Sequence, residues 1–187
     1  MTAGVASDLL ARIESFLKPL YQDLDGGSRL EEALRIGEIA ATLYHPPIET
    51  ERRHFEVLIL FQRLGKWLDK PRNFSRAVLA LEPTITTTEL RRAARVLTSL
   101  ENPTEAAAIA LAAAAIIDAA GLRGLAEDFA SARREGTTAL EIAAGSLAHD
   151  EPLPGWFPDQ GRSLIAQRRQ RRREVCRMLL DEEKGVL

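Results

Sequence analysis

Apolar residues recur along most of the chain at intervals of three and four, and this spacing constrains the fold more than any other feature of the sequence. Residues three and four apart lie on one face of an α-helix, whereas a half-buried strand needs strict alternation of apolar and polar residues, which is missing here. Strong helix formers also dominate the composition. We therefore predict an all-α protein, a bundle of about eight or nine helices.

Glycines, prolines and capping residues divide the pattern into successive helices. Thr88 is the expected N-cap of the helix in the segment 84–97, and Asn102 followed by Pro103 is the expected start of an alanine-rich helix. The expected helical segments are about 8–22, 29–44, 49–68, 74–81, 84–97, 102–121, 122–136, 137–150 and 159–183.

The length of 187 residues suits a single domain that buries a substantial core. We predict one domain over residues 1–187, with a flexible N-terminus at 1–6 and a long C-terminal helix at 159–183. Cys176 is the only cysteine, which excludes an internal disulfide and argues for a packed or idle thiol. No signal peptide or apolar membrane span is evident, so we expect a cytoplasmic protein.

The order and spacing of four segments resemble a known pattern. These segments are EALRI at 32–36, LFQRLGK at 60–66, DAAGL at 118–122 and the charged segment 155–183. Together, from about residue 8 to 183, they resemble the small single-domain bacterial branch of the HD superfamily. That superfamily consists of helical, metal-dependent phosphohydrolases named for an adjacent His-Asp pair. The resemblance implies an HD-like helical domain.

The metal ligands of that family are replaced in this chain. Glu32 stands in the place of the first histidine, Gln62 and Arg63 replace the His-Asp pair, and Asp118 alone remains of the last motif. A neutral amide is a weak ligand, and a guanidinium has no lone pair to offer and stays protonated. We therefore expect no metal, no other cofactor and no catalytic residue, and hypothesise that Arg63 occupies the metal's place between Glu32 and Asp118. The alternative is that Arg63 points to solvent.

The predicted function is non-catalytic: binding or regulation in a pseudoenzyme of the HD superfamily. We expect either an unknown small anionic ligand, held by Arg35, Arg63 or Lys66, or a protein partner. A homodimer is possible as well. The rival class is an atypical metal-dependent phosphohydrolase, acting on a nucleotide or phosphate ester with Glu32 and Asp118 as residual ligands. Metal content discriminates between these two classes.

A third class is a nucleic-acid binder that uses the basic run QRRQRRREVCR in the last helix. The arginines of this run wrap around the helix, no aromatic residue interleaves them, and the net charge of the chain is −2. We expect a solvated helix with some arginines paired to acids such as Asp128, and no nucleic-acid or membrane partner. The three histidines, His45, His54 and His149, are expected at the surface.

Overall fold

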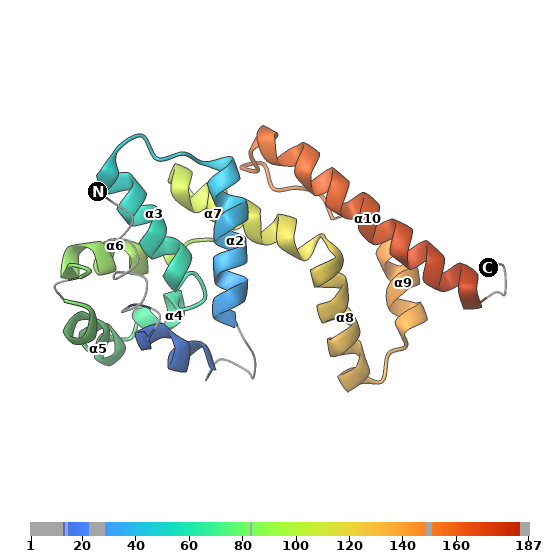
Figure 1. Cartoon of the computed structure of the whole chain (residues 1–187), viewed down its shortest axis with the longest axis horizontal. Coiled ribbons are helices and arrows are strands. Elements are labelled where there is room, and N and C mark those ends of the chain that lie inside the picture. Colours follow the sequence, from blue (N-terminus) through green and yellow to red (C-terminus); the bar gives the residue numbers. More distant parts are fainter. Residues whose placement is uncertain (1–12, 14, 23–28, 83, 149–150, 184–187) are drawn as a thin grey trace. The chain divides into compact units, whose positions relative to one another are not determined.

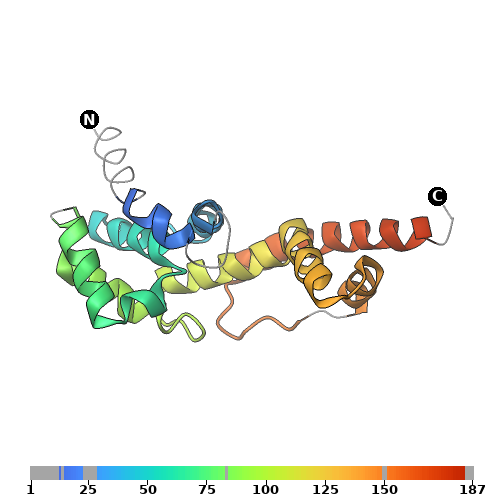
Figure 2. The same cartoon turned by 90° about the horizontal axis from the view of Figure 1, so that it is seen from below.

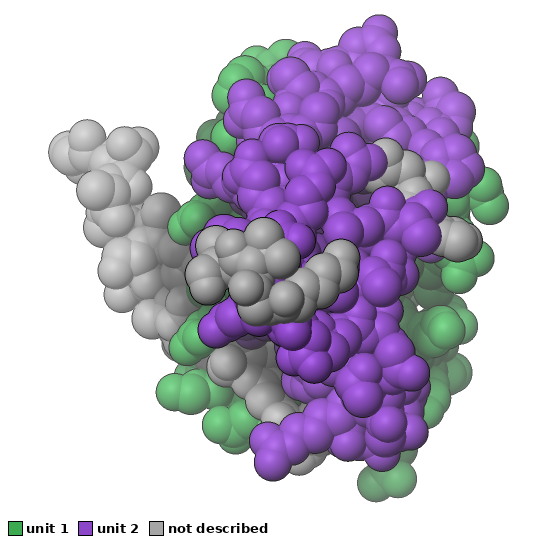
Figure 3. All heavy atoms as spheres, turned by 90° about the vertical axis from the view of Figure 1, so that its right-hand side faces the viewer, with its two compact units in different colours: residues 1–112 green, residues 113–187 purple. Residues whose placement is uncertain are grey.

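The computed structural model describes residues 13, 15–22, 29–82, 84–148 and 151–183. Every regular element in these ranges is a helix, and the helices pack against one another (Figure 1), so the prediction of an all-α helical bundle is confirmed. The chain divides into two compact units, Met1–Ala112 and Ala113–Leu187, which Figure 3 colours green and purple. The single domain over residues 1–187 stays a prediction.

Unit 1 is built around α3 (Glu49–Phe61), which packs against both α2 (Arg29–Leu43) and α6 (Thr87–Leu97). The short α4 (Gly65–Leu68) contacts α5 (Pro71–Leu81) and α6. Residues 13 and 15–22 are helical as well. The α3 face between α2 and α6 is apolar, which places the core of the unit there. Its largest fully buried side chains include Tyr21, Ile36, Leu58, Phe61, Leu64 and Leu90.

The predicted helix over residues 49–68 is wrong in one respect, because it breaks between α3 and α4. The backbone N–H of Leu64 donates to the carbonyl of Phe61 at 2.7 Å, a tight turn that leaves the α-helical ladder. Gly65 then packs against the next layer: a Cβ at this position would lie 2.9–3.0 Å from atoms of Leu97. The break therefore follows from tertiary packing in the segment LFQRLGK.

Three helix starts also differ from the prediction. The N-cap of α6 is Thr86, not Thr88, because Thr86 and Glu89 form a capping box in which each side chain bonds to the other's backbone N–H. The helix predicted at 74–81 begins three residues earlier, since Pro71 is the first residue of α5. Finally, α7 (Ala106–Ala119) begins after Pro103, which lies in a non-helical segment.

Unit 2 contains the end of α7 together with α8 (Leu122–Glu135), α9 (Ala139–Ala148) and α10 (Asp159–Glu183). Gly136, with a left-handed φ of 79°, ends α8. The three helices enclose a small core of Leu125, Ala143 and Cys176, so the expectation of a packed Cys176 is confirmed. Figures 1 and 2 show α10 as one unbroken helix, and its bounds agree with the predicted 159–183.

No single helix in the described ranges is long and apolar enough to cross a membrane. One bent pair, α7 followed by α8, meets the requirement by length and composition only. The predicted flexible N-terminus at 1–6 and His149 lie outside the described residues.

Candidate functional site

Gln62 stands at the C-terminal end of α3, in the turn that replaces the expected helix. Its amide nitrogen donates to two backbone carbonyls, that of Ala33 at 2.8 Å and that of Ile59 at 3.2 Å. The Ala33 bond ties α3 to α2, since the two residues belong to different helices. Both N–H groups of the amide are thus used for structure, which leaves the amide oxygen as the side chain's only lone-pair donor.

Arg63 follows in the same turn and forms a salt bridge with Glu32 of α2. The Arg63 side chain is 44% exposed, whereas that of Glu32 is only 11% exposed. The pair therefore lies at the rim of the unit, with the carboxylate inside and the guanidinium partly in solvent. One half of the predicted ion cluster, the contact between Arg63 and Glu32, is present in the structure.

Tyr21 is a neighbour of this pair that sequence reasoning missed. Its hydroxyl donates to the carbonyl of Leu60 at 2.9 Å, and its ring is fully buried. Burial raises the pKa of Tyr21 above its ordinary value, while the nearby Arg63 acts in the opposite direction and Glu32 adds to the rise. The signal was available: Tyr21 continues the four-residue spacing of Ile13 and Leu17, and a tyrosine at a core position needs a partner for its hydroxyl.

The two other predicted anion-binding residues lie on the elements that flank the salt bridge. Arg35 is partly exposed and follows Glu32 by one turn on α2, so the two side chains share a helix face. Lys66 is exposed in α4, three residues after Arg63.

Asp118 belongs to unit 2, where it faces α10. Its carboxylate lies 3.6 Å from the guanidinium of Arg168, and its side chain is only 7% exposed. A cation of the C-terminal helix therefore balances this carboxylate within its own unit. The second half of the hypothesised cluster is a contact between Arg63 and Asp118. These residues belong to different units, and the contact stays a prediction.

These residues do not fit the metal site that the HD resemblance implies. Gln62 is committed to backbone carbonyls, and Arg63 brings a permanent cation to Glu32. A divalent ion at this carboxylate would have to displace the guanidinium or accept its repulsion. Within the described residues, no three His, Cys, Asp or Glu side chains form a group that could hold a metal ion.

His54 is a correction to the predicted surface histidines, because it is buried in α3. Its Nε2 lies 3.4 Å from the Glu105 carboxylate, yet neither ring nitrogen makes a hydrogen bond within the described part of the chain. Arg92 connects this cluster: it lies 3.0 Å from Glu105 and 3.6 Å from Glu51. Burial lowers the pKa of His54, and Arg92 lowers it further, against the opposing effect of the two glutamates. The exposed His45 agrees with the prediction.

No protein-family model matches this chain, and neither a curated protein nor a solved structure matches it.

Proposed function

We propose that this protein is a non-catalytic, HD-like binding protein in which a salt bridge takes the position that a metal ion holds in HD-type hydrolases. The observation that carries the proposal is the contact of Arg63 with Glu32, two residues that the resemblance assigns to ligand positions. A guanidinium already fixed beside the carboxylate provides the positive charge that a metal would otherwise supply.

The ligand in this proposal is a small anion bound at Arg63. Within the described residues the Arg63 side chain bonds to Glu32, and a guanidinium has five N–H donors, so several donors at its exposed edge remain for an anion. Arg35 on α2 and Lys66 on α4 add two positive charges on the elements that flank the salt bridge. A cytoplasmic location belongs to the same proposal and is supported by the single, buried Cys176.

Two measurements on the purified protein test the absence of catalysis. The first is elemental analysis, for which we expect metal well below one equivalent per chain. The second is a phosphatase assay with p-nitrophenyl phosphate and added manganese or nickel, for which we expect no turnover above the buffer rate. Stoichiometric metal together with turnover that Asp118→Ala abolishes would overturn the proposal in favour of the phosphohydrolase.

A third measurement tests binding, with inorganic phosphate as the probe in NMR titrations. Phosphate should shift the amide resonances around Arg63, and Arg63→Gln should weaken that binding at least about tenfold, because a charge-assisted hydrogen bond is lost. Arg76→Gln is the matched control, since Arg76 is an exposed arginine of unit 1 on α5. Equal losses in the two variants would mean that phosphate responds only to overall charge, which would contradict a site at Arg63.

A further inference from the structure

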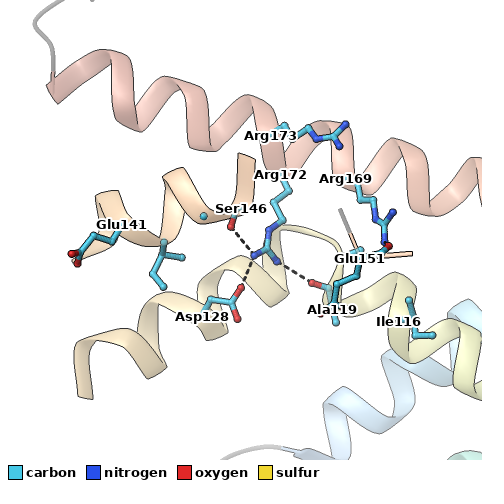
Figure 4. A pocket seen from close by; sticks show the side chains of 12 residues that line it. Ile116, Ala119, Asp128, Glu141, Ser146, Glu151, Arg169, Arg172 and Arg173 are labelled. Carbon is cyan, nitrogen blue, oxygen red and sulfur yellow. Dashed lines mark hydrogen bonds and ion pairs between the residues drawn. The ribbon is translucent and has the colours of Figure 1, made fainter. Parts of the chain in front are cut away.

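Unit 2 contains a cavity of about 530 Å³ that is lined by residues of α8, α9, α10, the end of α7 and the loop before α10 (Figure 4). This volume falls within the range of about 300–1,000 Å³ that is usual for small-molecule sites. All lining residues belong to unit 2. None of them is among the residues of the proposed function.

One wall of the cavity is basic. Arg169, Arg172 and Arg173 line it from α10, and residues at positions i, i+3 and i+4 share one face of a helix. Arg172 and Arg169 reach down from α10 toward the other elements, while Arg173 extends along the helix (Figure 4). The acidic lining residues are spread over three elements, namely Asp128 in α8, Glu141 in α9 and Glu151 in the loop before α10. Positive charge is therefore concentrated on one side.

Arg172 is held in place before any ligand arrives. Its guanidinium bonds to the Asp128 carboxylate at 2.5 Å, the Ser146 hydroxyl at 2.9 Å and the Ala119 carbonyl at 3.2 Å (Figure 4). The three acceptors belong to three different helices, and the Arg172 side chain is only 19% exposed. Three of the five guanidinium N–H groups are thus engaged, and two remain. Because the side chain is partly exposed, these two donors are open to an acceptor from solvent or from a ligand.

Apart from Ser146, the remainder of the lining is formed by small or aliphatic residues. Ile116 contributes from the end of α7, Ala120 from the turn that follows it, and Ile142 from α9. Gly145 of α9 also lines the cavity, and a Cβ at this position would meet nothing within 4 Å. An apolar group can therefore be buried beside the arginine wall.

We propose that this cavity binds a small molecule that carries one anionic group, a carboxylate or a phosphate monoester, on a short aliphatic body. Arg172 and Arg169 bind the anion, and the body packs against Ile116, Ala120 and Ile142. A guanidinium fixed by Asp128, Ser146 and Ala119 loses little conformational freedom on binding, which favours affinity. The site shares no residue with the Arg63–Glu32 pair and does not rest on the proposed function.

The test is an NMR titration of the full chain with three probes: octanoate, octyl phosphate and octan-1-ol. We expect one or both anions to shift the resonances of Ser146, Gly145 and Ala120, and octan-1-ol to bind at least about tenfold more weakly. The comparison of octanoate with octyl phosphate shows which anion the arginines accept. Equal binding of the alcohol, or no shift with either anion, would overturn the proposal.

Two variants locate the site by different means. Arg169→Gln removes one cation and should weaken binding of the better anion at least about tenfold. Gly145→Leu leaves the charge unchanged and adds an apolar side chain at a lining position where a Cβ would meet nothing within 4 Å, so it should weaken binding by occupying part of the cavity. Circular dichroism confirms that each variant retains its helix content.

Two control variants separate this site from general charge effects and from the proposed function. Arg171→Gln removes an exposed arginine of the same helix that does not line the cavity, and it should leave binding unchanged. Arg63→Gln changes the residue on which the proposed function depends, and it too should have no effect. A loss in Arg171→Gln as large as that in Arg169→Gln would show non-specific attraction and contradict the site.

Discussion

At the scale of single residues, the two partners of the Arg63–Glu32 salt bridge differ in exposure. Glu32 has an 11% exposed side chain, so removal of Arg63 leaves a nearly buried carboxylate without this partner. Arg63 is 44% exposed, so removal of Glu32 leaves a guanidinium that water can solvate. Loss of the cation should therefore cost more than loss of the acid.

This asymmetry gives the first prediction. Arg63→Met should lower the free energy of unfolding by about 1 kcal/mol, Glu32→Gln should lower it by less, and the double variant should be more stable than the sum of the two losses implies. Urea denaturation of the four proteins measures the coupling. Strictly additive losses would contradict a direct interaction between the two side chains.

His54 gives a prediction for pH. Burial and the nearby Arg92 lower its pKa in the folded protein, so below pH about 6.5 the unfolded chain binds more protons than the folded one. The contribution of His54 to stability is therefore complete above that pH and declines as the pH falls, with a slope of at most about 1.4 kcal/mol per pH unit. Glu105 and Glu51 reduce the effect without reversing it, because the pKa remains lowered.

Urea denaturation at pH 7.5, 6.5 and 5.5 measures this slope. The variant His54→Gln has no group that titrates at this position, so its stability should change less across the range than that of the parent protein. His45→Gln, which removes an exposed histidine, should retain the slope. A parent protein that becomes more stable from pH 7.5 to 5.5 would refute the direction of the effect.

At the scale of elements, the turn between α3 and α4 depends on how closely Gly65 approaches Leu97. A methyl group at residue 65 would lie 2.9–3.0 Å from the Cβ and backbone of Leu97, and a backbone cannot move aside as a flexible side chain can. Gly65→Ala should therefore lower the free energy of unfolding by about 1–3 kcal/mol, although alanine is the better helix former.

The matched control for this prediction is Gly155→Ala. A Cβ at Gly155 would meet nothing within 4 Å, so this substitution should change stability by less than about 0.5 kcal/mol. Thermal and urea denaturation of both variants provide the comparison. A Gly65→Ala variant as stable as the parent protein would mean that the close approach to Leu97 does not fix the turn.

The turn also shows what sequence can and cannot predict at this scale. The long helix at 159–183 was predicted with its observed bounds, because a proline-rich loop precedes it and helix formers fill it. The break after Phe61 was not, because a single glycine, here Gly65, is tolerated inside a helical pattern and the break depends on Leu97, about thirty residues away. Local patterns fix the helices, and distant contacts fix where they bend.

At the scale of the whole molecule, the same distinction separates the two candidate sites. The Arg63–Glu32 contact was predicted because a family pattern connects two distant segments. The burial of His54 was missed because its helix face is charged in the sequence and becomes buried only beside Arg92 and Glu105. The expected pairing of an arginine of the last helix with Asp128 is confirmed by Arg172. The cavity of unit 2 was not predicted, since no local pattern shows that Arg172 also reaches Ser146 and the Ala119 carbonyl.

The overall charge of the chain gives the last prediction, which concerns nucleic acid. The net charge is −2, and three arginines of the basic run contact other groups of unit 2: Arg168 with Asp118, Arg169 with the Glu151 carbonyl and Arg172 with Asp128. A DNA backbone needs several accessible cations in a row, which is a stricter demand than that of one small anion, and it would also meet the acids that follow on α10. We therefore expect weak binding of duplex DNA, with a dissociation constant larger than about 10⁻⁴ M at physiological salt.

Fluorescence polarisation of a labelled duplex, recorded at several salt concentrations, measures this affinity. The positive control replaces the exposed acids 181–183 at the end of α10 with lysine, which reverses the sign of the net charge. This variant should gain weak binding that falls steeply with salt, because each phosphate contact releases counterions. If the parent protein already shows that steep salt dependence, its arginines engage phosphate despite their acidic partners. The last helix would then be a nucleic-acid surface, and the third class of function would replace the binding of a small anion.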